Sequence, residues 1–482
     1  MKVSDALAQA FVKEGVTTIF GLMGNGNMYW WQALDLHPDV TIHETRHEGT
    51  ALTMAEGWAR ATGKVGVCAV TQGPGLTQLA TALTVASRAK VPIVVFAGET
   101  AFSDHDSVQK YNQQKFVDAT EAGFVPILRA GDAEEAVRTA FYRARMESRP
   151  IVLNAPMDIQ AETYEGDIDE YEPSSTLLPG YQRIQPDPDR LRDVVKLLSE
   201  SSKPVIVAGQ GAAKANAGEA ITTLADRIGA LLATTLPMQG YLGEEEYHVG
   251  VSGLYATRTA IDLFADADVV IGVGASLNHY TTEHGYIFPN AKYVQIDVAP
   301  SIVMGNGKRA DHYLRGDARL TVEALEQGLA AQNVKSTGFR TAEVRGMLAE
   351  YDPDPREFAL DPGTVDPRRA AAILDDGLPS EVGVIHGTGH CSGITAFFMR
   401  KPRDLTWAIN TFGCIGQAVP TAIGAAVARA FGCRGTMATT LDEVKAGVDE
   451  FLAGDGPMLL DIRVSRSVIS VPYSRLWFGE DV

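Results

Sequence analysis

The sequence is poor in cysteine, has no long apolar run and has no excess of basic residues. Its cysteines, Cys68, Cys391, Cys414 and Cys433, form no CxxC pair, so we expect buried thiols in a reducing cytoplasm rather than a disulfide framework. No stretch of about 18 apolar residues occurs, which argues against a membrane-spanning helix. The net charge of −18 argues against a nucleic-acid surface, which needs clustered Lys and Arg.

Length and composition indicate a multidomain globular protein. The 482 residues suggest about two to four domains at roughly 100–200 residues each. Apolar residues at 45% and charged residues at 21% exclude a disordered chain, a collagen and a coiled coil. The first residues form an amphipathic helical pattern opened by Ser4 and Asp5, without the apolar core and cleavage site of a signal peptide. We therefore expect a cytoplasmic protein.

Short β-branched runs alternate with Ala-rich helical segments along most of the chain. Examples of the runs are Val65–Val70, Ile93–Phe96 and Val205–Val207, and the helical segments include 48–62 and 76–89. Continuous apolar strands joined by helices predict an α/β fold of doubly wound parallel sheets. Acidic and Pro-rich stretches suggest boundaries, which gives a first domain at 1–165, a linker at 166–184, a central domain at 185–340 and a third domain at 341–482.

Three loops in the first domain follow predicted strands. They are the Gly-rich segment 20–27, the segment 45–51 around Glu48, and the segment 70–75, which reads VTQGPG. Taken singly, each has a plain structural interpretation as a tight turn or as a carboxylate at a helix N-terminus. Because ligands bind at the carboxyl ends of parallel strands, the three together predict a ligand site.

The order of these loops resembles the pyrimidine-binding domain of thiamine-diphosphate-dependent enzymes of the acetolactate synthase and 2-oxoacid decarboxylase type. That pattern reads FG-x-x-G, then HE-x-x-A, then T-x-GPG. The resemblance implies that Glu48 hydrogen-bonds the aminopyrimidine of thiamine diphosphate and promotes the tautomer that removes the thiazolium C2 proton. A dry site that raises the carboxyl pKa suits this role. The same resemblance assigns cofactor contacts to Gly24, Asn25, Thr71, Pro74 and Gly75.

The central domain carries two strand-then-Gly-x-Gly turns, at Gly209–Gly211 and Gly272–Gly274. A nicotinamide dehydrogenase is the rival interpretation, but Lys214 and Leu277 stand where the dinucleotide motif needs a third glycine. Some relatives bind FAD in this domain, but no FAD-specific motif can be mapped here residue by residue. We therefore expect a structural domain.

The third domain repeats the strand-then-glycine pattern. The loop at Gly389 and His390 resembles the family's diphosphate contact, although a polar turn is the plainer interpretation. The segment FGCIGQAVPTAIGA, 412–425, resembles the family's G-x-I-G-x-x-x-P-x-A-x-G-A motif. That match implies that the Gly413 carbonyl receives the cofactor's amino group and that the Ile415 side chain holds the cofactor bent. Gln113, in the polar segment 109–114, resembles a substrate-facing position, although a polar loop is the plainer interpretation of this segment.

The expected magnesium motif is missing. Relatives place GDG and a later Asn after this helix, which supply oxygen ligands to Mg²⁺, whereas here the chain runs directly from Ala430 into Phe431. A later Gly454-Asp455-Gly456 precedes the last strand and reads as a loop. A metal-binding stretch of the natural protein is not represented in this sequence, or the chain carries a true deletion, or the diphosphate is held in another way. We favour the first, because deleting a β-α-β stretch should cost more than the ~5–15 kcal/mol net stability of a domain. The metal ligands stay unknown.

The resemblance therefore implies a thiamine-diphosphate- and Mg²⁺-dependent lyase or transferase that decarboxylates a 2-oxoacid and passes the acyl carbanion equivalent to a proton or a second carbonyl. It also implies a homodimer or homotetramer in which Glu48 of one subunit meets Gly413 and Ile415 of the other. The alternative is a catalytically inactive relative that acts as a binding or scaffold protein. We expect neither nucleic acid nor membrane as a partner.

Overall fold

The computed structural model describes residues 1–180, 182–299, 309–349, 353–403, 406–409, 411–427, 434–454 and 458–479. The chain divides into two compact units. Unit 1 comprises Met1–Gly180 together with Asn410–Gly432, and unit 2 comprises Tyr181–Ile409 together with Cys433–Val482. The predicted junction between Ala430 and Phe431 lies outside the described residues, as do Asp455 and Gly456 of the GDG triplet.

Unit 1 is built on a six-stranded parallel sheet of order β2-β1-β3-β4-β6-β5. The strands are β1 (Thr18–Gly21), β2 (Thr41–Glu44), β3 (Gly66–Val70), β4 (Ile93–Glu99), β5 (Gly123–Pro126) and β6 (Pro150–Pro156). The central strands β3, β4 and β6 are almost wholly buried because helices cover both faces of the sheet, which is why they read as continuous apolar runs.

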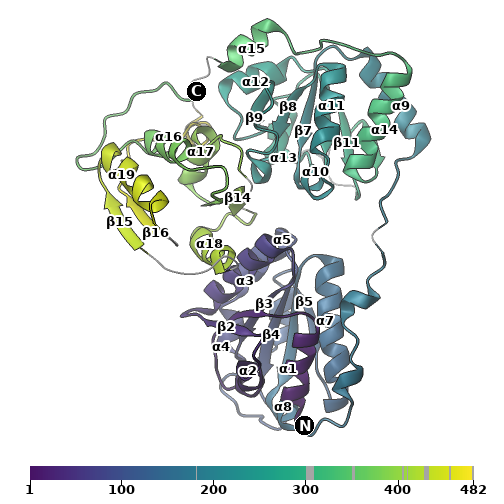
Figure 1. Cartoon of the computed structure of the whole chain (residues 1–482), viewed down its shortest axis with the longest axis vertical. Helices are drawn as coiled ribbons and strands as arrows, with labels where there is room; N and C mark the ends of the chain where they lie inside the picture. Colours follow the sequence, from purple (N-terminus) through teal and green to yellow (C-terminus); the bar gives the residue numbers. More distant parts are fainter. Residues whose placement is uncertain are drawn as a thin grey trace. The chain divides into compact units, whose positions relative to one another are not determined.

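Helices pack on both faces of this sheet (Figure 1). One core lies under α1 (Val3–Lys13), α2 (Met28–Asp35), α7 (Ala133–Glu147) and α8 (Met157–Ala161). The other lies under α3 (Glu48–Thr62), α4 (Pro74–Thr77), α5 (Ala80–Arg88) and α6 (Gln113–Asp118). The predicted helix 48–62 is confirmed and ends at Gly63 in the left-handed conformation, whereas the predicted helix 76–89 is two helices.

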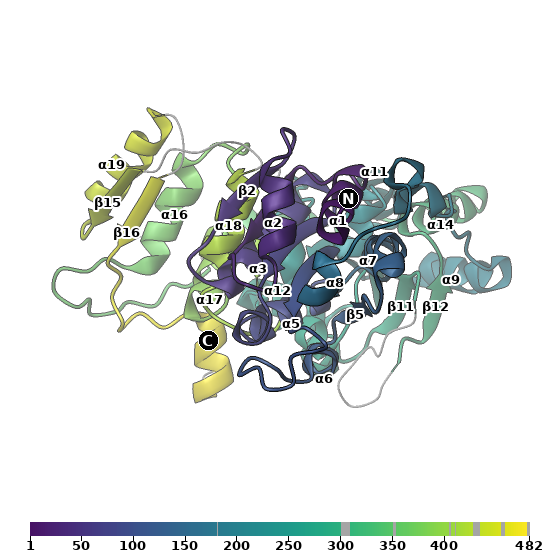
Figure 2. The same ribbon diagram turned by 90° about the horizontal axis from the view of Figure 1, so that it is seen from below.

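A late segment of the chain returns to unit 1. Helix α18 (Ala418–Val427) lies beside α3 in both views (Figures 1 and 2). Glycines let the two backbones approach, since a Cβ on Gly57 would lie 2.9 Å from the carbonyl carbon of Thr421, and a Cβ on Gly424 would lie 2.6 Å from the Cα of Met54. The Thr53 hydroxyl donates to Gln417 Oε1 at 2.7 Å across the same contact.

Unit 2 contains a second six-stranded parallel sheet of order β12-β11-β10-β7-β8-β9. Its strands are β7 (Pro204–Ala208), β8 (Leu231–Thr234), β9 (His248–Val251), β10 (Val269–Val273), β11 (Lys292–Asp297) and β12 (His312–Arg315). The helices of this part are α9 (Pro188–Glu200), α10 (Gln210–Lys214), α11 (Gly218–Ile228), α12 (Arg258–Ala265), α13 (His279–Thr282), α14 (Ala318–Ala331) and α15 (Ala342–Ala349). Apolar cores lie on both faces of this sheet as well.

The rest of unit 2 contains two separate strand pairs. Parallel β13 (Val384–Gly387) and β14 (Thr406–Ile409) form one pair, and parallel β15 (Arg434–Ala438) and β16 (Met458–Ile462) form the other. The helices are α16 (Pro367–Gly377), α17 (His390–Phe398), α19 (Leu441–Leu452) and α20 (Val471–Tyr473). The α/β class is thus confirmed with two full parallel sheets, but the predicted third doubly wound sheet is not confirmed in the described residues.

Two further expectations concern exposure. Among the described cysteines, Cys68 is buried, but Cys391 is exposed and Cys414 is partly exposed, so the expectation of uniformly buried thiols is wrong. Cys391 is the second residue of α17 and lies on its exposed side. Exposure of this small thiol side chain costs little. In the described part of the chain, no helix is both long and apolar enough to cross a bilayer.

Candidate cofactor-binding site

The predicted loops of unit 1 gather at one edge of the sheet. Strands β1, β2 and β3 are parallel neighbours and end at Gly21, Glu44 and Val70. The loop after β1, the turn before α3 and the turn after β3 therefore meet at the carboxyl edge, where α/β sheets bind ligands. This edge is the place where the sequence predicted a ligand site.

Glu48 is the first residue of α3 at this edge. The helix is capped by His47, whose Nδ1 accepts a hydrogen bond from the Gly49 amide at 3.1 Å. The Glu48 side chain is half-buried and makes no hydrogen bond or ion pair with any residue that the structure describes. Burial, and to a lesser extent the negative charge of Glu48, raises the pKa of the Cys68 thiol on β3. Glu48 is thus available to a ligand.

The loop after β1 is held by side chains rather than by apolar packing. Asn27 accepts a hydrogen bond from the Gly24 amide at 2.8 Å and donates to the Leu22 carbonyl at 3.0 Å. The Gly26 amide donates to Thr71 Oγ1 at 3.0 Å, which ties this loop to the turn after β3. A Cβ on Gly24 would lie 2.6 Å from the Thr71 Cβ. The two predicted loops are therefore in direct contact.

Asn25 and Pro74 are exposed, whereas Gly75 is buried. Asn25 stands at the tip of its loop, and Pro74 opens α4. Asn27 was missed by the sequence analysis, although its place two residues after Asn25 in the segment GNGN was a signal for a loop-closing side chain.

Gln113 lies in the interior of the domain. It is 2% exposed, and its Oε1 accepts from the Gly73 amide at 3.1 Å. Its Nε2 donates to the Gly98 carbonyl at 3.0 Å and to Asn154 Oδ1 at 2.5 Å. These bonds fix Gly73, which has φ +61°, at the start of the GPG turn. Within unit 1, both amide atoms of Gln113 are occupied by protein partners.

A polar chain runs beside this turn. Thr71 Oγ1 donates to Gln72 Oε1 at 2.7 Å, and Gln72 Nε2 donates to Gln109 Oε1 at 2.7 Å. Gln72 is buried, and it occupies the variable position of the T-x-GPG pattern, so no sequence signal marked it as a site residue. Gln109 belongs to the same polar segment, 109–114, as the predicted site residue Gln113.

The segment that precedes α18 brings Gly413 and Ile415 to unit 1. Gly413 has φ +73° and nothing within 4 Å of an added Cβ, and the Ile415 side chain is 75% exposed. The Phe412 ring lies 4.7 Å from the Arg88 guanidinium at the end of α5. Phe412 is also exposed, so two neighbouring apolar side chains of this segment face outward.

Gly389 and His390 belong to unit 2. Gly389 has φ +126° and precedes α17. His390 Nε2 accepts a hydrogen bond from the Ser470 amide at 2.7 Å, and its ring lies 4.9 Å from that of Tyr473. Burial lowers the pKa of His390. This ring is therefore held by α20 within its own unit.

The Gly-x-Gly turns of the central domain pack against one another. The Gly211 amide donates to the Gly274 carbonyl at 3.0 Å, and a Cβ on Gly211 would lie 2.7 Å from the Gly274 Cα. Gly274 itself has φ +56°. Backbone packing therefore requires these glycines irrespective of any ligand.

The donor set of unit 1 fits one half of thiamine diphosphate better than the other. Glu48, at the carboxyl edge of the sheet, and the open backbone at Gly413 suit a heterocycle that bears a ring nitrogen and an amino group. Within the described ranges, no group of three or more His, Cys, Asp or Glu side chains could hold a metal ion. The residues of unit 1 thus fit the aminopyrimidine, whereas the described residues offer no cluster that fits magnesium.

Comparison with known protein families gives two matches. Residues 1–122 match the thiamine pyrophosphate enzyme N-terminal TPP binding domain, and residues 191–325 match the thiamine pyrophosphate enzyme central domain. The first match spans the loops that follow β1, β2 and β3, and the second spans the six-stranded sheet of unit 2.

Curated relatives extend the similarity over most of the chain. A probable acetolactate synthase large subunit of Methanocaldococcus jannaschii is 30% identical over 448 residues, which cover 89% of this chain and 74% of the relative. An acetolactate synthase large subunit of Corynebacterium glutamicum is 28% identical, with 88% and 68% covered. A sulfoacetaldehyde acetyltransferase of Castellaniella defragrans is 28% identical, with 89% and 75% covered.

Proposed function

Since this chain belongs to the thiamine pyrophosphate enzyme family and is of acetolactate synthase type, we propose that it decarboxylates a 2-oxoacid and transfers the acyl unit to a second carbonyl or to a proton. The relatives named above are acetolactate synthases and a sulfoacetaldehyde acetyltransferase. When bound, thiamine diphosphate supplies a nucleophilic carbon and an electron sink for this chemistry.

The single observation that carries the proposal is the position of Glu48. Its carboxylate begins α3 at the carboxyl edge of the sheet and has no partner among the described residues. A carboxylate in that position can share a proton with a ring nitrogen of a bound aminopyrimidine. We assign Glu48 the role of holding that proton.

The other unit 1 residues position the cofactor. Gly24 and Thr71 bring the two loops into contact, and Gly75 keeps the GPG turn narrow, so the backbone can approach a flat ring. Asn25 and Pro74, both exposed, form the rim of this edge. Gln113 is a positioning residue that holds Gly73 at the start of the GPG turn, because its side-chain amide already makes hydrogen bonds within the protein.

Gly413 and Ile415 complete the proposed site from the α18 segment. The Gly413 carbonyl would accept from the amino group of the cofactor, and the Ile415 side chain would support its bent shape. We propose that the site forms between two copies of the chain in a homodimer or homotetramer, since Ile415 is 75% exposed in the single chain. Gly389 and His390 of unit 2 are proposed for the diphosphate.

The missing metal ligands support a second candidate function. The described residues hold no metal-ligand cluster, and the sequence has no GDG-to-Asn stretch between Ala430 and Phe431. This observation favours a relative that retains the fold and a pyrimidine site without catalysis, acting as a binding or scaffold protein. Magnesium ligands are accordingly not assigned.

Titration of the full chain with thiamine diphosphate, with and without Mg²⁺, separates the two functions. Saturable binding that Mg²⁺ strengthens supports the enzyme, and binding that Mg²⁺ does not change supports the inactive relative. An intact mass near 51.7 kDa shows that no further stretch is present in the purified protein, and a mass several kDa higher shows the opposite.

Glu48→Gln tests the assigned role. The variant should retain cofactor binding and lose hydrogen–deuterium exchange at the cofactor C2 carbon by at least about a hundredfold, which is the size of a typical acid–base contribution. Glu44→Gln, at the exposed end of β2, is the matched control and should exchange as the unaltered protein does. Equal exchange in Glu48→Gln and Glu44→Gln refutes the role of Glu48.

A further inference from the structure

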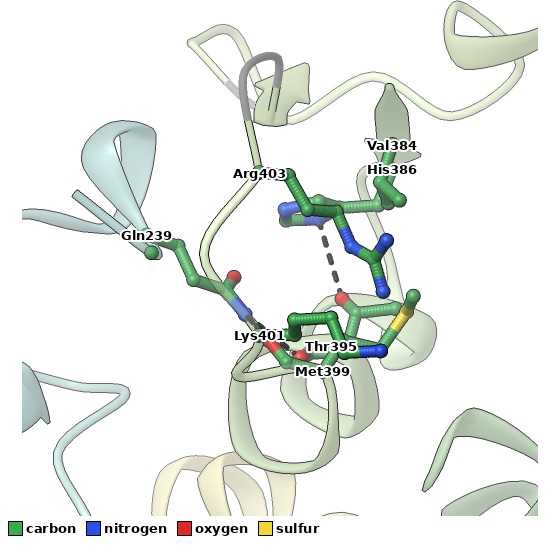
Figure 3. Close-up of a pocket in the computed structure, with 8 residues that line it drawn as sticks. Gln239, Val384, His386, Thr395, Met399, Lys401 and Arg403 are labelled. Atoms are coloured by element: carbon green, nitrogen blue, oxygen red, sulfur yellow. Dashed lines mark hydrogen bonds between the residues drawn. The ribbon is translucent and has the colours of Figure 1, made fainter. Parts of the chain in front are cut away.

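Unit 2 contains two adjoining cavities that share the lining residues Gln239, Gly240, Met399 and Lys401. The larger has a volume of about 350 Å³, within the range of small-molecule sites. It is bounded by the end of β8, the start of β9, and residues of α12, α16 and α17. The smaller extends toward His386 on β13 (Figure 3). None of these residues belongs to the site proposed above.

The walls carry buried polar atoms without hydrogen-bond partners among the described residues. They are Thr234 Oγ1, Gln239 Oε1, His248 Nε2 and His386 Nε2. Thr234 is fully buried, and Gln239 and His386 are each 7% exposed. A buried polar group without a partner loses the hydrogen bonds that it made to water in the unfolded chain. Such atoms in adjoining cavities therefore need partners, which ordered water or a bound molecule supplies.

The hydrogen bonds around His248 make its free nitrogen a donor. Its Nδ1 accepts from the Gly250 amide at 3.3 Å, so the ring proton resides on Nε2. Burial lowers the pKa of His248 to about 4, and the ring is therefore neutral at pH 7. Thr234, with its hydroxyl free to rotate, offers a second donor in the same cavity.

The smaller cavity presents acceptors. Gln239 Nε2 donates to the carbonyls of Thr395 at 2.9 Å and Met399 at 2.6 Å, which leaves Oε1 for a ligand (Figure 3). His386 Nδ1 lies 3.3 Å from Thr395 Oγ1, whose hydroxyl proton can reach the Cys391 carbonyl at 3.1 Å. In the tautomer that carries its proton on Nδ1, the ring donates to Thr395 Oγ1 and leaves His386 Nε2 as an acceptor.

The wall that the two cavities share contains the cationic side chain of Lys401. Lys401 Nζ donates to the backbone carbonyls of Asp376 at 3.1 Å and Leu378 at 3.0 Å. Among the described residues, it pairs with no carboxylate, whereas the neighbouring Arg403 is paired with Asp375 at 2.7 Å. An anionic group in the cavity would complete the charge balance at Lys401.

We propose that this cavity binds a small hydroxycarboxylate. Its carboxylate meets Lys401 and the donors of Thr234 and His248, and its hydroxyl donates to Gln239 Oε1 or His386 Nε2. Asp375, which also lines the larger cavity, is already paired with Arg403, and Asp376 is exposed, so Lys401 makes the shared wall unfavourable for a cation. The two acceptors disfavour an acid without a hydroxyl. The proposal rests on unit 2 alone and does not depend on catalysis at Glu48.

Calorimetric titration of the full chain with three related probes tests this chemistry. The probes are 2-hydroxyisobutyrate, isobutyrate, which lacks the hydroxyl, and 2-hydroxyisobutyramide, which lacks the charge. We expect the hydroxy acid to bind about 2- to 13-fold more tightly than isobutyrate and about 13-fold or more tightly than the amide, which correspond to one neutral and one charged hydrogen bond. Absence of binding by all three probes, or equal binding of all three, overturns the proposal.

Two variants with matched controls locate the site. Thr234→Val should weaken the hydroxy acid about 2- to 13-fold, while Thr321→Val, at another fully buried threonine whose hydroxyl has no partner in the described chain, should not. Lys401→Met should weaken it about 13-fold or more, while Lys196→Met, on the exposed side of α9, should not. The hydroxyls of Thr234 and Thr321 have no hydrogen-bond partner among the described residues, so Thr234→Val and Thr321→Val should both fold. Equal affinities for each variant and its control overturn the assignment to this cavity.

Discussion

The contact between α3 and α18 can be tested by adding one methyl group. Gly57 faces Thr421 and Ala425, and a Cβ there would lie 2.9 Å from the Thr421 carbonyl carbon and 3.0 Å from the Ala425 nitrogen. Ordinary contacts begin near 3.4 Å. Because the obstructing atoms are backbone, no side chain can rotate away in Gly57→Ala, and the helices must separate by roughly 1 Å.

The magnitude follows from two opposing effects. Overpacking costs about 1–3 kcal/mol, whereas alanine stabilises the interior of α3 by about 1 kcal/mol relative to glycine. We therefore expect Gly57→Ala to lower the free energy of unfolding of unit 1 by up to about 2 kcal/mol. Gly346 is the control, because it lies within α15 with nothing within 4 Å of an added Cβ. Gly346→Ala should stabilise its helix by about 1 kcal/mol.

Urea denaturation of the full chain measures the change in stability, and native-state hydrogen exchange locates it. In Gly57→Ala, the amides of residues 418–427 should exchange faster, since the contact that protects α18 is weakened. Amides of the β3–β4 pair should be unaffected. If Gly57→Ala stabilises the protein as Gly346→Ala does, and α18 exchanges at its original rate, then α18 does not pack on α3 as described.

Three further predictions concern buried polar groups. Glu14→Ala should lower the free energy of unfolding by about 3–5 kcal/mol in thermal or urea unfolding, because the Glu14 carboxylate pairs with a largely buried Arg145 at 2.7 Å. The control Glu121→Ala removes an exposed ion pair and should lower it by less than about 1 kcal/mol. Similar losses in the two variants would contradict this prediction. Gln113→Leu should lower cofactor affinity and stability together through release of Gly73, and an unchanged affinity would remove its positioning role. Burial lowers the pKa of His248 and His386 to about 4, against about 6.5 in the unfolded chain, so the unfolded state binds more protons between these pH values. The free energy of unfolding should therefore fall by up to about 3 kcal/mol per histidine as the pH is lowered from 6.5 to 4. A free energy of unfolding that does not change over this pH range would contradict the burial of the two rings.

The sequence predicted local features better than distant ones. The helix from Glu48 to Thr62 was predicted to the residue because a stop signal, Gly63, is adjacent in the chain. The break at Gln78 and Leu79 was missed, because the apolar pattern continues across it while Pro74 starts a separate short helix. Local patterns therefore mark where elements begin more clearly than where they break.

Gln113 shows why site residues were harder to predict. Its place in the chain resembled a substrate contact, but its partners Gly98 and Asn154 come from β4 and β6. No spacing in a single sequence reveals that three such distant residues share one hydrogen-bond network. The third sheet was expected from short apolar runs and from the family resemblance, and those runs form only two separate strand pairs in the described residues.

The return of α18 to unit 1 has a consequence for synthesis on the ribosome. The glycine face of α3 is made early, but the helix that covers it is encoded more than three hundred residues later, after most of unit 2. Domains generally fold in order as they emerge, so unit 1 must remain with an open face while the middle of the chain is translated. A protein shortened to Met1–Gly180 would keep that face open permanently, and an interrupted translation product would be a target for chaperones.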